Sequence, residues 1–81
     1  MSKDELFKKA KEDYFALCIA QVKALEKAPT EAQRLTGLHY SDGLKDGFIA
    51  CLHSFGIFSE NEIVAMELTG KIIQMEKGGL Q

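Results

Sequence analysis

The chain has 81 residues, of which 46% are hydrophobic and 27% charged, and a formal net charge of −2, the profile of one small globular domain over residues 1–81. This composition excludes a disordered chain, and apolar runs such as residues 48–52 are far shorter than the roughly 20 residues that cross a bilayer. The nearly even charge gives no sign of a nucleic-acid or membrane partner, and the charged N-terminal segment lacks the apolar core of a signal peptide, so we expect a cytoplasmic protein.

The first helix is expected over residues 3–27. Ser2 and Glu5 have the spacing of a capping box, in which each side chain accepts a backbone N–H left free at a helix start. Apolar residues then recur at intervals of three and four, which predicts one buried face. These residues are Phe7, Ala10, Tyr14, Leu17, Cys18, Val22 and Leu25. Pro29 ends the helix, because proline lacks the N–H that would continue it.

The second helix is expected over residues 30–55. Thr30 and Gln33 form another capping box directly after Pro29, so the first two helices should make a long antiparallel hairpin with a short corner. Eight side chains are expected to supply its apolar contacts: Leu35, Leu38, Leu44, Phe48, Ile49, Cys51, Leu52 and Phe55.

Glycines interrupt this second helix. Gly37, Gly43 and Gly47 each cost about 0.5–1 kcal/mol relative to alanine in a helix interior. Ser41 has the residue type of a new N-cap, which leaves a break near residues 41–43 as an alternative. We favour one continuous helix.

The third helix is expected over residues 60–77. Gly56 suits a left-handed C-cap of the preceding helix, and Ser59 and Glu62 form a third capping box. Gly78 and Gly79 should end the helix. Its apolar residues form a band wider than one packing face needs, so we expect burial on two sides. They are Ile63, Val64, Met66, Leu68, Ile72, Ile73 and Met75.

The predicted fold is therefore all-α, a three-helix arrangement (about 3–27, 30–55, 60–77) in which a long helical hairpin is joined by a third helix. Apolar residues occupy more than one side of both later helices, and a chain this short buries only about 60–65% of its unfolded surface. We accordingly expect self-association, as a homodimer.

Candidates for chemistry are few. His39, Asp42 and Asp46 share one helix face, but three ligands from a single helix make a poor metal site, and the same spacing arises on any solvated polar face. Cys51 and His53 are two residues apart, so on a helix they point in different directions and cannot act as a nucleophile and its base. We expect no catalytic, cofactor-binding or metal-binding residues. Both cysteines, Cys18 and Cys51, are read as small core residues.

A helix-turn-helix that binds DNA is the main alternative, over residues 48–69. Its recognition helix would begin with Glu60 and Glu62, which a phosphate-lined groove repels. Residues 1–34 hold seven bases and six acids, whereas residues 35–81 hold three bases and six acids. Nucleic-acid binding is therefore the less favoured function.

A line of small residues runs along the second helix at Gly43, Gly47, Ala50 and Ser54, where a neighbouring backbone can approach closely. Either the first or third helix of the same chain fills this line, or a second copy or another protein does. Because the helix-interior glycines have no evident local purpose, we predict a partner or dimer interface there. Its residues are Tyr40, Gly43, Gly47, Phe48, Ala50 and Phe58.

The segment of residues 47–62, within the wider range 43–62, resembles small all-α accessory proteins of phages and prophages. The likeness consists of an apolar helix with an early glycine, an end at Gly56-Ile57, and then Ser59 and acidic residues that open a short helix. The resemblance implies a non-enzymatic regulator, encoded by a phage or mobile element, that binds a host or phage protein.

Overall fold

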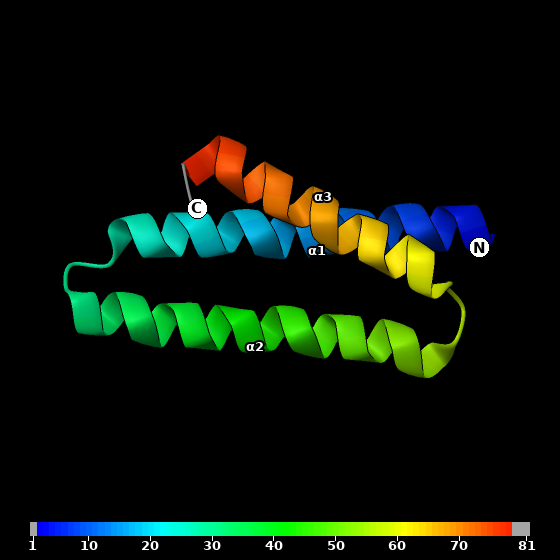
Figure 1. The fold of residues 1–81 in the computed structure, drawn as a ribbon, viewed down its shortest axis with the longest axis horizontal. Coiled ribbons are helices and arrows are strands. Elements are labelled where there is room, and N and C mark those ends of the chain that lie inside the picture. The colour runs from blue at the N-terminus through cyan, green and yellow to red at the C-terminus, as the bar shows by residue number, and fades with distance from the viewer. Residues whose placement is uncertain (1, 79–81) are drawn as a thin grey trace.

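The computed structural model describes residues 2–78, which form three helices and no strand. Helix α1 spans Lys3–Lys27, α2 spans Glu31–Phe55 and α3 spans Glu60–Gly78 (Figure 1). The all-α class is confirmed, and each described helix end lies within one residue of its prediction. Gly79, expected at the end of the third helix, lies outside the described residues.

The helix starts follow from local hydrogen bonds. Helices α1 and α3 begin with complete capping boxes; at α3, Ser59 N donates to Glu62 Oε1 at 2.8 Å and Glu62 N donates to Ser59 Oγ at 3.1 Å. At α2, Gln33 N donates to Thr30 Oγ1 at 3.1 Å. The Gln33 side chain accepts the Thr30 hydroxyl instead of the backbone N–H, so this box is only half formed.

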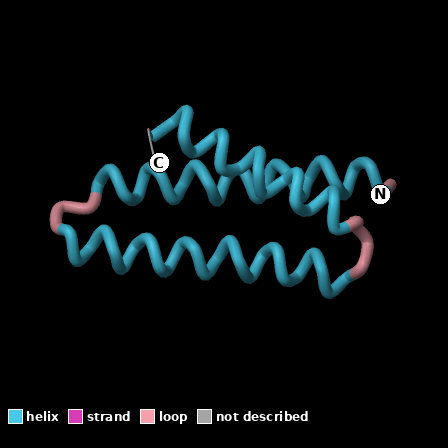
Figure 2. Tube along the Cα trace, in the orientation of Figure 1, coloured by secondary structure: helices cyan, strands magenta, loops and turns pink. Residues whose placement is uncertain are grey.

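Helix α2 is continuous, as the uninterrupted coil in Figure 2 shows. Ser41 is not an N-cap, because its hydroxyl donates to the Gly37 carbonyl oxygen at 2.7 Å, one turn back in the same helix. Gly56 ends the helix with φ 67°, a left-handed conformation that glycine adopts without strain.

Helix α1 is the centre of the molecule. It runs antiparallel to α2, and α3 crosses it obliquely and packs mainly against it rather than against α2 (Figure 1). The buried core cluster accordingly combines one face of α1 with a few residues of the other two helices. Its members are Ala10, Tyr14, Cys18, Leu52, Ile63 and Met66.

The close approach of α3 to α1 depends on glycine. A Cβ atom added at Gly70 would lie 2.8 Å from Tyr14 Cε2 and 2.9 Å from Cys18 Sγ. One added at Gly78 would lie 2.5 Å from Val22 Cγ1. Gly70 therefore has a structural reason to be glycine, because any side chain would push the two helices apart.

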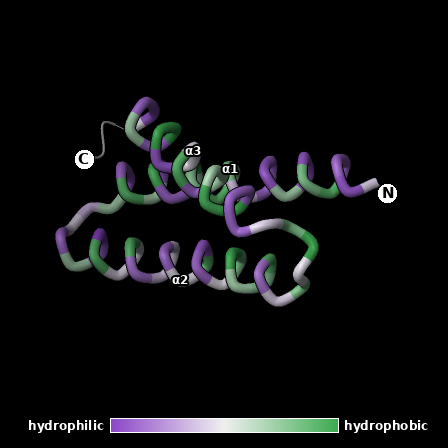
Figure 3. Tube along the Cα trace, turned by 45° about the vertical axis from the view of Figure 1, so that its right-hand side comes forward, coloured by the Kyte–Doolittle hydropathy of each residue, from purple (hydrophilic) through white to green (hydrophobic). Residues whose placement is uncertain are grey.

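The prediction that α3 is buried on two sides is wrong. Its buried residues lie on the face toward α1, and the opposite face is exposed. Because α3 packs mainly against one neighbour, it has no second helix to cover its outer apolar residues. Helix α2 is in the same position, and Leu52 is its one buried residue. Figure 3 shows hydrophobic segments recurring along both helices. The exposed large side chains are Leu35, Tyr40, Leu44, Phe55, Ile57, Val64, Leu68, Ile72 and Met75.

The elongated arrangement leaves a large surface. The chain measures 43 × 23 × 20 Å and exposes 5646 Å². A compact monomer of 9.0 kDa is expected to expose about 4,900 Å². The surface is thus several hundred Å² larger than that of a compact monomer.

Candidate protein-binding site

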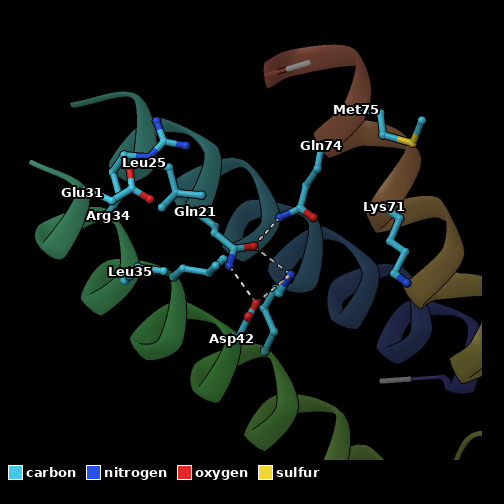
Figure 4. Close-up of a pocket in the computed structure, with 11 residues that line it drawn as sticks. Gln21, Leu25, Glu31, Arg34, Leu35, Asp42, Lys71, Gln74 and Met75 are labelled. Carbon is cyan, nitrogen blue, oxygen red and sulfur yellow. Dashed lines mark hydrogen bonds and ion pairs between the residues drawn. The ribbon is translucent and has the colours of Figure 1, made fainter. Parts of the chain in front are cut away.

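A groove of about 480 Å³ lies between the N-terminal half of α2 and the C-terminal half of α3, with α1 as its floor (Figure 4). It exists because α3 packs on α1 and does not close against this half of α2. Its lining residues are Gln21, Leu25, Glu31, Arg34, Leu35, Leu38, Asp42, Lys45, Lys71, Gln74 and Met75.

The floor of the groove holds a buried polar network around Gln21, which is 3% exposed. Gln21 Nε2 donates to Asp42 Oδ1 at 2.8 Å, and Gln21 Oε1 accepts from Lys45 Nζ at 2.8 Å and from Gln74 Nε2 at 2.6 Å. Gln74 Nε2 also donates to the Cys18 carbonyl oxygen at 3.1 Å. The network joins all three helices and fixes the shape of the floor, since breaking it would leave buried polar groups unpaired.

The walls of the groove are apolar with basic residues beside them. Leu35 and Leu38 of α2 stand on one side and Met75 of α3 on the other. Arg34 adds a guanidinium to the α2 wall, and Lys71 adds an ammonium group to the α3 wall. Within residues 2–78 neither cation belongs to an ion pair. Glu31 lines the α2 wall beside Arg34, so the groove offers apolar contacts flanked by two cations and one carboxylate (Figure 4).

A second apolar surface lies on α3 and is called here the outer stripe. It consists of Val64, Leu68, Ile72 and Met75, which are 44%, 58%, 54% and 58% exposed. At a spacing of four, four and three residues these side chains share one face of the helix. This face is opposite the one that holds Ile63, Met66 and Gly70 against α1.

The structure leaves the predicted line of small residues open. Gly43, Gly47 and Ala50 are exposed, and no atom lies within 4 Å of a Cβ built at either glycine. The alternative in which α1 or α3 of the same chain fills this line is therefore wrong. Tyr40 is 70% exposed on the same outward side of α2.

The two phenylalanines predicted for that interface lie elsewhere. Phe48 packs inward against Tyr14, with ring centroids 6.0 Å apart, and Phe58 packs against Phe7 at 5.2 Å. Both rings border the core of the same chain. The six predicted interface residues consequently do not form one continuous surface.

Of the two cysteines predicted to be core residues, one is buried and the other is exposed. Cys18 is 1% exposed, as expected of a core residue, but Cys51 is exposed on the outward side of α2. Burial raises the pKa of the Cys18 thiol, an effect that the nearby Lys45 ammonium partly offsets. Burial also raises the pKa of Tyr14 to about 12, with smaller contributions from Cys18 and Glu67. Both buried groups are therefore neutral at pH 7.

The candidate metal ligands are not assembled. Asp42 accepts the hydrogen bond from Gln21, while His39 and Asp46 are exposed. Among residues 2–78, no three histidine, cysteine, aspartate or glutamate side chains come together in a way that would hold a metal ion. His53 is also exposed, because it lies on the outward side of α2.

The helix-turn-helix alternative assigns DNA recognition to α3. The exposed face of α3 carries the outer stripe, and its first turn carries Glu60 and Glu62. Lys71 and Lys77 are the two basic residues of the helix. An apolar face with an acidic start is poorly matched to a phosphate-lined groove.

The polar floor is the functional feature that the sequence prediction missed. A signal for it exists, because Gln21 follows Tyr14 and Cys18 at helical spacing, and Gln74 follows Met66 and Gly70 in the same way. A glutamine in a buried stripe requires a hydrogen-bonding partner. Its partners come from other helices, so spacing alone does not identify them.

Comparisons with known proteins found no matching family model, no matching curated protein and no matching solved structure. The resemblance to phage accessory proteins stays a prediction. Within the described residues, no helix is both long enough and apolar enough to cross a membrane.

Proposed function

We propose that this chain is a small non-enzymatic protein that acts by binding an amphipathic helix of another protein in the groove between α2 and α3. The observation that supports this proposal is the groove itself, with Leu35 and Leu38 on one wall, Met75 on the other and α1 as the floor. A helix laid in this groove would pack against α2 and α3 at once, the arrangement of a four-helix bundle. Helices α2 and α3 of this chain would supply most of the contacts of the bound helix.

The charges beside the groove specify the kind of helix that fits. Arg34 and Lys71 flank the apolar walls from opposite sides. A partner helix with an apolar stripe and acidic residues on both sides of that stripe would place carboxylates near these cations. Such complementarity favours the correct partner and its orientation more than it adds affinity.

The proposal includes two further elements. The first is a homodimer, supported by the several hundred Å² of surface beyond that of a compact monomer. The second is a regulatory role toward a host or phage protein, supported by the helix-end pattern of residues 47–62 alone.

Affinity capture from the native cell with three forms of the tagged protein tests the groove. The groove variant is Arg34→Glu/Leu35→Glu, and the control is Phe55→Ser, which changes a side chain that is 72% exposed and outside the groove. We expect the wild type and the control to retain the same protein and the groove variant to lose it, with helicity unchanged by circular dichroism. Equal capture by all three forms, or recovery of nucleic acid alone, would contradict the proposal.

A further inference from the structure

We propose that two copies of the chain pair through the outer stripe of α3, with the two α3 helices antiparallel about a two-fold axis near Thr69. This inference rests on the homodimer of the proposed function and assigns it a surface that shares Lys71 and Met75 with the groove, so a second copy and a partner helix would compete for these two side chains. The partner that fits is a second copy of the same chain, because both the apolar stripe and the charges beside it are self-complementary.

The apolar part of this complementarity follows from spacing. Val64 and Met75 stand at the two ends of the outer stripe, with Leu68 and Ile72 between them. The midpoint of the stripe falls between Thr69 and Gly70. An antiparallel copy centred there places Leu68 beside Ile72 of the second copy and covers both ends equally, as a two-fold interface requires.

The charges are centred within one residue of the same point. Glu67 and Lys71 lie four residues apart along one edge of the outer stripe, and their midpoint is Thr69. Within the described chain they form no ion pair with each other or with another residue. Antiparallel pairing brings Glu67 of each copy beside Lys71 of the other, which gives two equivalent ion pairs.

The residues on the opposite edge of the outer stripe are compatible with antiparallel pairing, and the charges favour it over parallel pairing. Ala65, Thr69 and Glu76 border the stripe on its other side, and antiparallel pairing sets Glu76 of one copy against Ala65 of the other. Parallel pairing would instead set the edge that carries Glu67 and Lys71 against the opposite edge of the other copy, which carries Ala65, Thr69 and Glu76. The parallel dimer would therefore lack the two equivalent pairs between Glu67 and Lys71.

The surface area is of the right size. A standard interface covers about 800 Å² on each partner. The several hundred Å² by which this chain exceeds a compact monomer is of the same order. The four exposed apolar side chains of the outer stripe share one helix face, and exposed apolar patches of this kind mark interaction sites.

Sedimentation equilibrium on the full chain tests the assignment with matched variants. Leu68→Lys places a charge in the outer stripe, whereas Leu44→Lys makes the same change at a leucine of α2 that is 46% exposed. We expect Leu68→Lys to weaken the dimer by at least about tenfold in dissociation constant and Leu44→Lys to leave it unchanged. Both side chains are exposed, so both variants should retain the helical circular dichroism of the wild type.

A charge exchange tests the orientation. Glu67→Lys places a lysine beside Lys71 of the other copy at both equivalent positions and should weaken the dimer. The double variant Glu67→Lys/Lys71→Glu exchanges the two charges and should restore the wild-type dissociation constant. If the Leu68→Lys variant dimerises as tightly as the wild type, or if Gly47→Leu disrupts the dimer instead, the assignment to α3 is wrong. The homodimer itself would remain supported. A monomer at every concentration would overturn both, while the groove proposal would be unaffected.

Discussion

At the scale of single residues, the helix-interior glycines divide into two kinds. Gly70 lies where α3 meets α1, and a Cβ there would collide with Tyr14 and Cys18. Gly43 and Gly47 face open space. The sequence indicated that these glycines were costly, but whether a neighbour stands over them depends on helix crossing, which local pattern does not encode.

Alanine substitutions at these positions should have opposite effects on the free energy of unfolding. Gly70→Ala forces the Tyr14 ring or Cys18 to move and should lower it by about 1–3 kcal/mol. Gly43→Ala removes the glycine penalty of an exposed helix position and should raise it by about 0.5–1 kcal/mol. Urea denaturation of both variants measures the difference. Equal effects at the two sites would show that α3 does not approach α1 as closely as described.

Tyr14 predicts how stability depends on pH. Its pKa is about 12 in the folded protein against an ordinary value of 10.0, so the folded state keeps the phenol proton over a range in which the unfolded chain loses it. The contribution of the buried Tyr14 phenol to the free energy of unfolding is fully present below pH 10 and decreases as pH rises from 10 to 12. Tyr14→Phe should make that fall shallower in denaturation curves recorded across this range. An unchanged slope would mean that the phenol is not buried.

At the scale of elements, the sequence predicts helix ends well because caps are local. Ser59 and Glu62, which are three residues apart, form the hydrogen bonds that their spacing predicts. The sequence predicts buried faces well on α1, whose stripe is covered on both sides by α2 and α3. It predicts them poorly on α3, where the same apolar density is buried on one face and exposed on the other.

The cap of α3 provides a test at this scale. Ser59→Ala removes the hydroxyl that accepts the Glu62 N–H and should lower the free energy of unfolding by about 1 kcal/mol. The same hydrogen bonds at Ser59, together with Lys3, hold the pKa of Glu62 below its usual range. The stabilisation from Glu62 is therefore present above its unfolded pKa and lost as pH falls through the lower folded value. A Ser59→Ala variant as stable as wild type would contradict the cap.

At the scale of the whole molecule, the arrangement around α1 determines which surfaces are available. The Gln21 network ties the three helices together at one end, and the groove opens above it. Helices α2 and α3 each cover a side of α1 and are left with apolar faces of their own. The sequence predicted this surplus of apolar surface but not its location, because location depends on how α3 crosses α1.

In the proposed dimer, a second copy of the chain covers the outer stripe of α3. Methyl NMR spectra recorded during serial dilution detect this contact residue by residue, since each apolar side chain reports on its own surroundings. The methyl signals of Leu68, Ile72 and Met75 should shift together as the protein is diluted, while those of buried Ile63 and exposed Leu44 stay in place. Signals of the outer stripe that do not move while those of Leu44 do would contradict the claim.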